Sequence, residues 1–367
     1  MSDQLHVGVA GLHFGSAFLP IYQQHPAVRE VSIADTDPDR LAWAGDKFGV
    51  RRRHASLDGL LADPDVDAIH LLSPVSFHAR QSVAVLRAGK HCACAVPMAT
   101  SLDDLLAIIA AQEDTGRVYM MMETSVFSRE YFYARGLLEA GELGDLTFYR
   151  GFHLQDLDGF PAYWQGYPPM HYVTHALSPA LALTGTTVRS VQCLGSGKLT
   201  PERAGSYDNP FPLEAGLFRL REHDMAVDVV LSFFQTARAY TEGFSLYGSR
   251  VGLEWPTEEG GPLRVHEFGA IPAGGRGRAV SVRDAFPPDR DDLLPPELGV
   301  FTRNVAMHGG SHPHLVHEWI SSIAWGRRPL VDARTAAAWT APGICAHDSA
   351  LAGGQLVEVP DFALPSS

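Results

Sequence analysis

The stretch His6-Val7-Gly8-Val9-Ala10-Gly11-Leu12-His13-Phe14-Gly15-Ser16, near the amino end of the 367-residue chain, decides the fold. An apolar run that stops at a glycine and continues with helically spaced apolar residues predicts a strand, a tight turn and a helix. This is the opening unit of a dinucleotide-binding fold, where backbone N–H groups at the turn hold a diphosphate. The glycine pattern is irregular, because His13 and Ser16 stand where G-x-G-x-x-G has glycine.

Asp35 supports this interpretation. It follows the apolar run 31–34 at about twenty residues from the glycine turn, where dinucleotide-binding folds place the carboxylate that binds the ribose hydroxyls of NAD. The alternative is that Asp35 only caps the helix that follows. The basic stretch 51–53 could meet the 2′-phosphate of NADP, so NAD is the expected cofactor and NADP the less favoured one.

Further cofactor contacts are expected where later strands end. Ser73 and Pro74 follow an apolar strand, at the edge of a parallel sheet where ligands bind. His78 is expected to begin a helix over that edge. The complete set of expected cofactor-binding residues is Gly11, His13, Phe14, Gly15, Asp35, Ser73, Pro74, His78 and Pro97.

Composition limits the partners. The formal net charge of −13 disfavours nucleic acid and anionic membranes, and no apolar run is long enough to span a membrane. The first predicted strand starts by His6, which leaves no room for a secretory signal, so a cytoplasmic protein is expected. The four cysteines lie in apolar segments and are interpreted as reduced core thiols rather than a disulfide or zinc site.

The order of the predicted elements indicates two domains. Strands and helices alternate up to about Met122, which is typical of a parallel, doubly wound α/β sheet. Beyond Gly144, β-rich runs with polar turns predict a mostly antiparallel sheet, interrupted by helices at 172–183 and 314–325. The stretch 256–296, rich in glycine, proline and charge, is expected to be irregular. The expected domains are residues 1–124, which bind the dinucleotide, and residues 125–367, an α+β domain.

The sequence resembles the Gfo/Idh/MocA family of NAD(P)-dependent oxidoreductases. The resemblance rests on the glycine turn, on Ala88-Gly89-Lys90-His91 and on the closing stretch Gly326-Arg327-Arg328-Pro329-Leu330-Val331-Asp332. It implies an amino-terminal Rossmann domain and a carboxy-terminal substrate domain whose open sheet face builds dimers or tetramers. Family members mostly oxidise or reduce a carbinol carbon of a sugar or cyclitol, so a carbohydrate-like substrate and a homo-oligomer are expected.

Two motifs depart from this family. The usual members carry Glu-Lys-Pro after Gly-Lys-His, and their lysine assists proton transfer, whereas this chain has Ala95-Val96-Pro97. The usual Asp-x-Gly-x-His-x-x-Asp helix corresponds here to the stretch 171–178, which keeps only the histidine, His175. A proton relay centred on lysine therefore cannot operate in this chain.

One branch of the superfamily, the NAD-dependent α-N-acetylgalactosaminidases, has a similar loss. Several stretches are similar to that branch: Val96-Pro97, Met121-Met122-Glu123, Tyr172-x-Thr174-His175 and His308-Gly309-Gly310. The branch has Glu before Val-Pro and Pro after the Tyr, where this chain has Ala95 and Val173. The resemblance implies a related pocket rather than an identical substrate.

Without the lysine, another group must take the hydroxyl proton, and a neutral imidazole is best matched to this work near neutral pH. We expect His175 to be the acid/base and Tyr172 to share or relay the proton, with His171 along the same helix face. The alternative is that all three are packing residues. Glu123, expected at the end of a strand, is a third catalytic candidate, or else a helix cap.

Aromatic and amide side chains in the following segments predict sugar binding, since flat apolar rings suit the CH faces of a pyranose. The expected substrate-binding residues are His153, Gln155, Trp164, His171 and His308. The His171 and His175 pair also has the spacing of two metal ligands. No glutamate lies between them and hydride transfer needs no metal, so no metal is expected.

The sequence is compatible with three functions. The first is hydride transfer between NAD and a ring carbinol of a sugar, glycoside or cyclitol. The second is a glycosidase or lyase that oxidises a ring carbon transiently, eliminates a substituent and returns the hydride. The third is a nucleotide-binding sensor that has kept the fold and lost catalysis.

Overall fold

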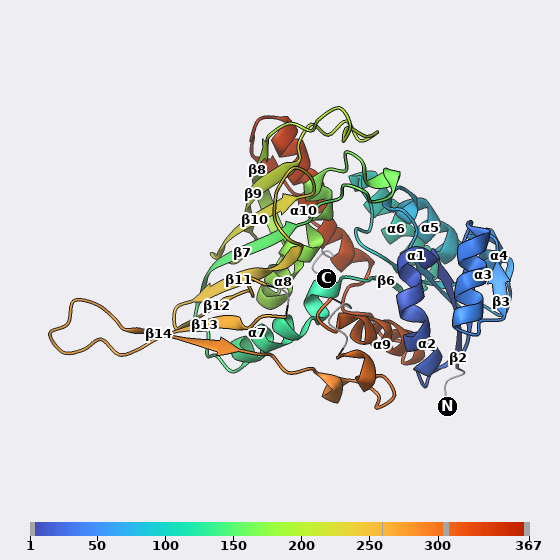
Figure 1. The fold of residues 1–367 in the computed structure, drawn as a ribbon, viewed down its shortest axis with the longest axis horizontal. Coiled ribbons are helices and arrows are strands. Elements are labelled where there is room, and N and C mark those ends of the chain that lie inside the picture. Colours follow the sequence, from blue (N-terminus) through green and yellow to red (C-terminus); the bar gives the residue numbers. More distant parts are fainter. Residues whose placement is uncertain (1–3, 259, 304–307, 363–367) are drawn as a thin grey trace. The chain divides into compact units, whose positions relative to one another are not determined.

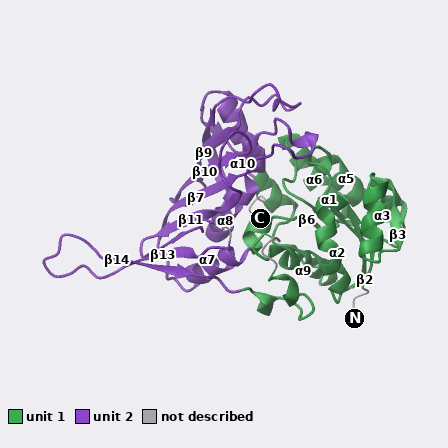
Figure 2. Cartoon of the chain, in the orientation of Figure 1, with its two compact units in different colours: residues 1–127, 289–340, 362–367 green, residues 128–288, 341–361 purple. Residues whose placement is uncertain are grey.

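The computed structural model describes residues 4–258, 260–303 and 308–362 (Figure 1). The contacts within it divide the chain into two compact units (Figure 2). Unit 1 comprises residues 1–127, 289–340 and 362–367, and unit 2 comprises residues 128–288 and 341–361. The expected domains 1–124 and 125–367 stay a prediction, because compactness alone does not define a domain boundary.

Unit 1 is built on a six-stranded sheet with the order β3-β2-β1-β4-β5-β6, in which all neighbours are parallel. This order confirms the predicted doubly wound α/β sheet. Every residue of strand β4 is buried, as expected for a central parallel strand. The strands are β1 (Leu5–Ala10), β2 (Val28–Ala34), β3 (Arg52–His54), β4 (Ala68–Leu71), β5 (His91–Cys94) and β6 (Tyr119–Met121).

The helices of unit 1 follow the predicted alternation, with one difference after the first strand. The predicted helix from Phe18 is replaced by α1 (Leu12–Gly15), a 3-10 turn (Ser16–Phe18) and α2 (Leu19–Gln24), whose first turn holds Pro20. Proline lacks the N–H group that a helix interior needs, so a new helix begins there. The remaining helices are α3 (Pro38–Lys47), α4 (Leu57–Ala62), α5 (His78–Arg87), α6 (Leu102–Thr115) and α9 (Ser311–Ala324).

Unit 2 is built on a nine-stranded sheet with the order β14-β13-β12-β11-β7-β10-β9-β8-β15. Among the described strands of this sheet, only β7 and β10 pair in parallel, so the predicted, mostly antiparallel sheet is confirmed. The strands are β7 (Leu146–Leu154), β8 (Val188–Ser196), β9 (Leu213–Leu220), β10 (Ala226–Ser232), β11 (Thr241–Gly248), β12 (Val251–Glu254), β13 (Leu263–Phe268), β14 (Val280–Ala285) and β15 (Val357–Glu358).

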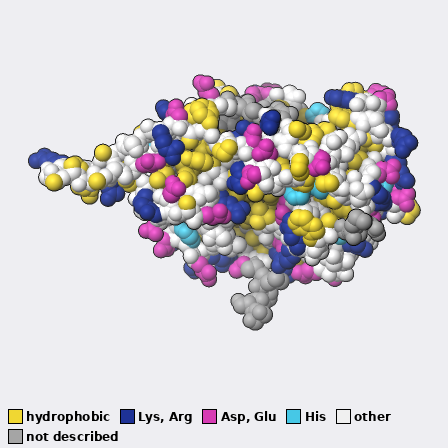
Figure 3. Space-filling model, turned by 90° about the horizontal axis from the view of Figure 1, so that it is seen from below, with side chains coloured by type: hydrophobic (Ala, Val, Ile, Leu, Met, Phe, Trp, Pro, Cys, Tyr) yellow, Lys and Arg dark blue, Asp and Glu magenta, His cyan; other side chains and the backbone are white. Residues whose placement is uncertain are grey.

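The expectation that residues 256–296 are irregular is wrong. Strands β13 and β14 form a hairpin at one edge of the unit 2 sheet, with Phe268 opposite Val280. In strand β14 the residues 280–284 are all exposed and Ala285 is buried. The strand therefore lacks the alternation of buried and exposed residues by which a strand is recognised in a sequence. The loop between these strands projects from the sheet and carries hydrophobic and basic side chains (Figures 1 and 3).

Helix α8 (Thr174–Thr184) packs tightly against strand β7. The Tyr149 hydroxyl donates a hydrogen bond to the carbonyl of Ala176 at 2.7 Å. A Cβ atom at Gly151 would lie 2.0 Å from the same carbonyl oxygen, so only glycine permits this approach. Strand β7 thus fixes the first turn of α8, which carries His175.

Helix α10 (Ala333–Leu351) was not predicted, and helix α7 comprises Arg129–Glu139. All four cysteines are buried and free of disulfide bonds. None of the helices in the described part of the chain combines the length and the apolar content that crossing a membrane requires.

Candidate active site

The glycine turn of unit 1 joins the carboxyl ends of three strands. Gly11 has a φ of 92°, and its N–H group donates to the carbonyl of Ala34 at 2.9 Å. A Cβ atom on Gly11 would lie 2.5 Å from the carbonyl oxygen of Leu72. The turn therefore requires a bare Cα, and it presents backbone without a side chain at the edge where parallel sheets bind nucleotides.

Asp35 lies directly at this turn and is 9% exposed. Its Oδ2 accepts a hydrogen bond from the Leu12 N–H group at 2.7 Å, and its Oδ1 accepts one from Asp37 at 2.9 Å. Each carboxylate oxygen has a further lone pair, so the group can still accept from ribose hydroxyls. The alternative that Asp35 caps the following helix is wrong, because the cap of α3 is Asp37, whose Oδ1 accepts from the N–H groups of Asp39 and Arg40. The role of Asp35 as a ribose ligand stays a prediction, and these residues fit a bound dinucleotide.

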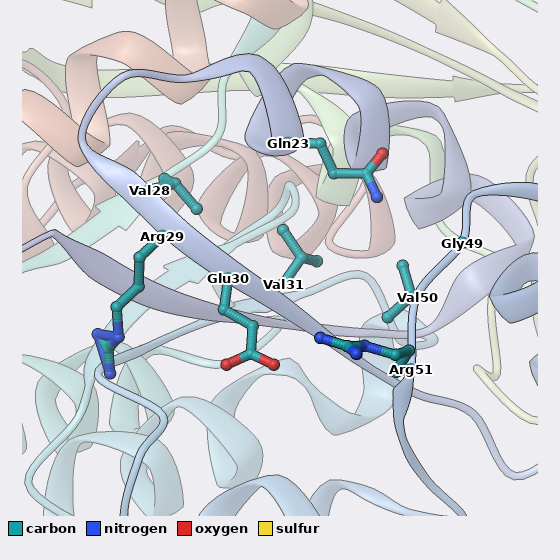
Figure 4. Close-up of a pocket in the computed structure, with 8 residues that line it drawn as sticks. All are labelled: Gln23, Val28, Arg29, Glu30, Val31, Gly49, Val50 and Arg51. Atoms are coloured by element: carbon teal, nitrogen blue, oxygen red, sulfur yellow. The ribbon is translucent and has the colours of Figure 1, made fainter.

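The structure does not place the basic stretch 51–53 beside Asp35, where it could bind the 2′-phosphate of NADP. Arg52 and Arg53 lie in salt bridges with carboxylates, at 2.9 Å from Asp65 and 2.8 Å from Asp46. Arg51 lines a pocket beside residues 28–31, in the amino-terminal half of β2, whereas Asp35 follows the carboxyl end of that strand (Figure 4). A guanidinium nitrogen of Arg40, by contrast, lies 3.7 Å from the Asp35 Oδ2 atom.

His13 and Phe14 are exposed on α1, so the His13 side chain does not fill the turn from within. The Phe14 ring lies edge-on to the rings of His308 and His312, with centroids 5.9 and 5.5 Å apart. Gly15 is buried, and an added Cβ would approach the Leu72 side chain to 3.0 Å. The displaced glycine therefore allows close packing of helix and strand, which is the usual task of the third glycine in the fingerprint.

His78 ties together the two backbone segments that follow β4 and β5. Its Nε2 lies 2.9 Å from the carbonyl oxygen of Ser73 and its Nδ1 lies 2.8 Å from that of Pro97. Carbonyl oxygens only accept, so both ring nitrogens must carry a proton. Burial by itself lowers the pKa of His78, but Cys94 and the two carbonyl groups outweigh it and raise the pKa to about 9. Pro74 begins the short turn between Ser73 and His78.

The His78 cation makes a testable contribution to stability. A folded-state pKa above the ordinary 6.5 stabilises the fold fully below that pH, and the contribution is lost as the pH rises through about 9. We expect His78→Gln to lower the free energy of unfolding by up to about 3 kcal/mol near pH 6. The loss should shrink toward pH 10, as measured by chemical denaturation. A deficit that does not change with pH would contradict a charged His78.

Glu123 lies just beyond β6, with its side chain fully buried. Its Oε1 accepts a hydrogen bond from the Ser125 N–H group at 3.0 Å, at the start of a 3-10 turn (Thr124–Phe127). The predicted place at the carboxyl end of a parallel strand is confirmed by the fold. Its catalytic role stays a prediction.

A group of rings in unit 2, which we name the His153 cluster, brings several predicted residues together. His153 is 2% exposed, and its ring centroid lies 5.7 Å from those of both Tyr172 and His175. The Tyr172 and His175 rings are 5.0 Å apart, and Trp164 packs edge-on against Tyr172 at 5.5 Å. The cluster consists of His153, Trp164, Tyr172, His175, Phe233 and Tyr240.

Polar partners surround His153 on both sides of its ring. Its Nε2 lies 3.2 Å from the Gln155 Oε1 atom, and its Nδ1 lies 3.9 Å from the Glu242 Oε2 atom. Glu242 was not predicted, although it stands directly opposite His153 in the β7 and β11 register. Phe233 and Tyr240 were also missed. Phe233 follows the end of β10 and Tyr240 precedes β11, so both lie outside the paired residues. For Glu242, only the strand register could have revealed its place, and the sequence does not specify that register.

The prediction that His171, Tyr172 and His175 share one helix face is wrong. Residues 169–172 form a 3-10 turn, and α8 begins only at Thr174. The His171 ring instead lies edge-on to His347, with centroids 5.0 Å apart. Burial and the neighbouring His347 lower the pKa of His171 to about 3. His171 is therefore neutral and lies outside the contacts that define the His153 cluster.

His308 belongs to unit 1, where its Nδ1 lies 3.2 Å from the Nε2 atom of His312. It has a φ of 45° and precedes two glycines at the start of α9. Within the described residues, no three or more His, Cys, Asp or Glu side chains are grouped as a metal site would require.

Together, the parallel sheet and the glycine turn define the class of a dinucleotide-binding fold, with Asp35 beside the turn. Comparison with known proteins agrees. Residues 5–123 match the family described as "Oxidoreductase family, NAD-binding Rossmann fold". The resemblance to the Gfo/Idh/MocA family is thus confirmed on this segment, as are the class of NAD-dependent oxidoreductase and NAD as its cofactor.

Individual relatives extend the similarity over the rest of the chain. A 4-carboxy-2-hydroxymuconate-6-semialdehyde dehydrogenase of Sphingobium sp. is 27% identical over 58% of this chain and 68% of its own. A glycosyl hydrolase family 109 protein of Streptomyces niveus is 25% identical over 98% of this chain and 77% of its own. The solved structure of levoglucosan dehydrogenase in complex with NADH and levoglucosan matches 98% of this chain and 100% of its own, with 21% identity and a TM-score of 0.80. That last likeness establishes the fold.

Proposed function

We propose that the protein is an NAD-dependent dehydrogenase that oxidises a ring carbinol of a sugar, anhydrosugar or cyclitol. The observation that carries this proposal is the His153 cluster, which combines an imidazole and a phenol at 5.0 Å with apolar ring faces. Such a surface suits a pyranose, whose CH faces are apolar and whose rim is polar. The NADH and levoglucosan complex of a protein with the same fold supports this substrate class.

In the proposed reaction, NAD+ supplies the hydride acceptor when it is bound. Neutral His175 takes the proton of the reacting hydroxyl as the carbon–hydrogen bond breaks, and the carbinol becomes a ketone. Tyr172 shares that proton through its hydroxyl. Gln155 and His153 hold neighbouring hydroxyl groups of the ring, and Trp164 contacts its CH face. We assign Glu123 to orienting the ribose or the substrate, and His308, whose ring lies beside that of Phe14, to substrate binding.

A second function is favoured by the relative from Streptomyces niveus, which covers nearly the whole chain. In this alternative NAD+ oxidises a ring carbon to a ketone, the same residues remove a proton from the neighbouring carbon, and the glycosidic substituent leaves with a proton as an alcohol, which gives an enone. In a glycosidase, water then adds to the double bond, and the hydride returns from NADH to the ketone carbon; in a lyase, the hydride returns and the double bond stays. NAD is then recycled within each turnover. The two functions differ in whether NADH accumulates.

Both functions are tested by one panel of substrates. The purified protein is incubated with NAD+ and levoglucosan, aldoses, cyclitols or chromogenic glycosides such as an α-N-acetylgalactosaminide. Stoichiometric NADH and ketone support the dehydrogenase. Release of an aglycone without NADH rejects it in favour of the second function. No reaction across the panel, with NAD+ bound in calorimetry, rejects both and favours a nucleotide sensor.

We further infer that unit 2 forms a homo-oligomer through the open face of its sheet. Leu194 on β8 and Leu217 on β9 are 61% and 64% exposed, and the two strands are direct neighbours. In this register Leu194 faces Ala215 and Leu217 faces Gln192, so the two leucines are diagonal neighbours on one face of the sheet. Two large exposed apolar side chains so placed favour a buried contact. We expect Leu217→Glu to lower the molar mass measured by light scattering, whereas the matched control Leu106→Glu, on α6 of unit 1, should not. Equal masses for all three proteins would contradict this interface.

A further inference from the structure

Unit 2 contains a buried acid–imidazole pair that the proposed mechanism does not use. Glu214 on β9 is fully buried, and His347 on α10 is 5% exposed. The Nδ1 atom of His347 lies 2.7 Å from the Glu214 Oε1 atom. The other carboxylate oxygen accepts a hydrogen bond from the N–H group of Met170, also at 2.7 Å. One carboxylate thus connects β9, α10 and the 3-10 turn 169–172.

Helix α10 meets this turn at a second point, one helical turn before His347. A Cβ atom at Gly343 would lie 2.1 Å from the carbonyl oxygen of Met170 and 2.8 Å from the Val173 side chain. Residues four apart lie on the same face of a helix, so Gly343 and His347 present one surface to the turn. Met170 is therefore held at its N–H group by Glu214 and confined at its carbonyl group by α10.

A contribution to the overall stability of the fold is a poor explanation for such a buried pair. Burying an acid–base pair costs about as much solvation free energy as its internal interaction returns, and apolar replacements of such buried pairs are often neutral or stabilising. The pair does provide a directional contact to one backbone N–H group, two residues before Tyr172. Directional contacts of this kind fix geometry, which matters most where a reacting group must be placed to within a fraction of an ångström.

We propose that Glu214, through its pair with His347, is a positioning residue that sets the turn 169–172 and thereby places Tyr172 beside His175. This rests on the proposed function, because it assigns the purpose of the turn to that reaction. Tyr172 follows Met170 by two residues within the same 3-10 turn, so a shift of Met170 carries the Tyr172 ring with it.

The first test measures the turn without any substrate. Hydrogen exchange of the Met170 amide is compared in the wild type, Glu214→Ala, and the double variant Glu214→Gln with His347→Gln. We expect faster exchange in Glu214→Ala, which has lost the acceptor. The double variant should exchange slowly, because a glutamine oxygen accepts from Met170 and the two amides pair. Unchanged exchange in Glu214→Ala would overturn the proposal.

The second test measures catalysis in the same variants. A displacement of about 1 Å can cost about 100-fold in rate, so we expect kcat to fall by up to that factor in Glu214→Ala. The affinity for NAD+ should not change, since unit 1 binds it. Gly343→Ala, which pushes on Met170 from the other side, should also lower kcat. Gly136→Ala is the matched control, because a Cβ there meets nothing within 4 Å.

The double variant separates positioning from proton transfer. It carries no titratable pair, so near wild-type kcat and pH profile would support positioning. A low kcat with an ordered turn would overturn positioning and indicate that the pair moves a proton. If the wild type oxidises no carbinol, the proposed function fails, while amide exchange still decides whether the pair holds the turn.

Discussion

Replacing His175 by glutamine lowers kcat for carbinol oxidation by about 100- to 10,000-fold, the range typical of general acid–base catalysis. Glutamine fills a similar volume but cannot take a proton near neutral pH. His175 is 4% exposed, so a variant of similar size keeps the packing of α8. The measurement is the initial rate of NADH formation at saturating NAD+. The dissociation constant for NAD+ should remain unchanged in calorimetry.

A pair of tyrosine variants controls for damage to the His153 cluster. Tyr172→Phe removes the hydroxyl proposed to share the proton, and we expect a clear loss of kcat. Tyr167→Phe removes a buried hydroxyl that has no hydrogen-bond partner among the described residues, and its ring also packs against Tyr172. We expect Tyr167→Phe to keep the wild-type rate. Full activity in both His175→Gln and Tyr172→Phe would refute the acid/base assignment.

Replacing Gly11 by alanine weakens NAD+ binding at least tenfold. The added Cβ would overlap the carbonyl group of Leu72 at 2.5 Å, and a side chain at a φ of 92° adds about 1–3 kcal/mol of backbone strain. The turn must shift to relieve the overlap, and the Leu12 N–H group moves away from Asp35. We expect at least a tenfold weaker affinity for NAD+ in calorimetry, which corresponds to about 1.4 kcal/mol.

Gly49→Ala is the matched control for this variant. Gly49 also belongs to unit 1 and has a positive φ of 67°, but a Cβ there meets nothing within 4 Å. It therefore carries the conformational cost of a positive φ without the overlap. We expect Gly49→Ala to bind NAD+ like the wild type, with only slightly lower stability. Equal NAD+ affinities for Gly11→Ala and the wild type would show that this turn does not hold the dinucleotide.

Unit 1 could be predicted in detail because its signals are local. The glycine turn and Asp35 are close in sequence to the strands that place them, and the alternation of strands and helices is readable from hydrophobic periodicity. The β13 and β14 hairpin escaped prediction because β14 is exposed and its loop is rich in glycine. Helix α10 escaped because its alanines and Pro342 give no amphipathic pattern.

The residues of the candidate site in unit 2 could be predicted only where their side-chain chemistry is recognisable in the sequence. His153, Trp164, Tyr172 and His175 carry recognisable chemistry, and the structure brings their rings together. Glu242 stands opposite His153 only through strand register, which tertiary packing sets. His171 was misplaced because helical spacing was assumed for residues that form a 3-10 turn.

The fate of the transferred hydrogen tests the central claim most directly. The protein is incubated with NAD+ and a substrate sugar deuterated at its ring carbons, and the products are analysed by mass spectrometry. The proposed dehydrogenase yields NADH that carries one deuterium on the nicotinamide, together with one equivalent of ketone, and His175→Gln yields neither at a comparable rate. Deuterium that stays in the sugar while a glycosidic bond is cleaved and no NADH accumulates would contradict it.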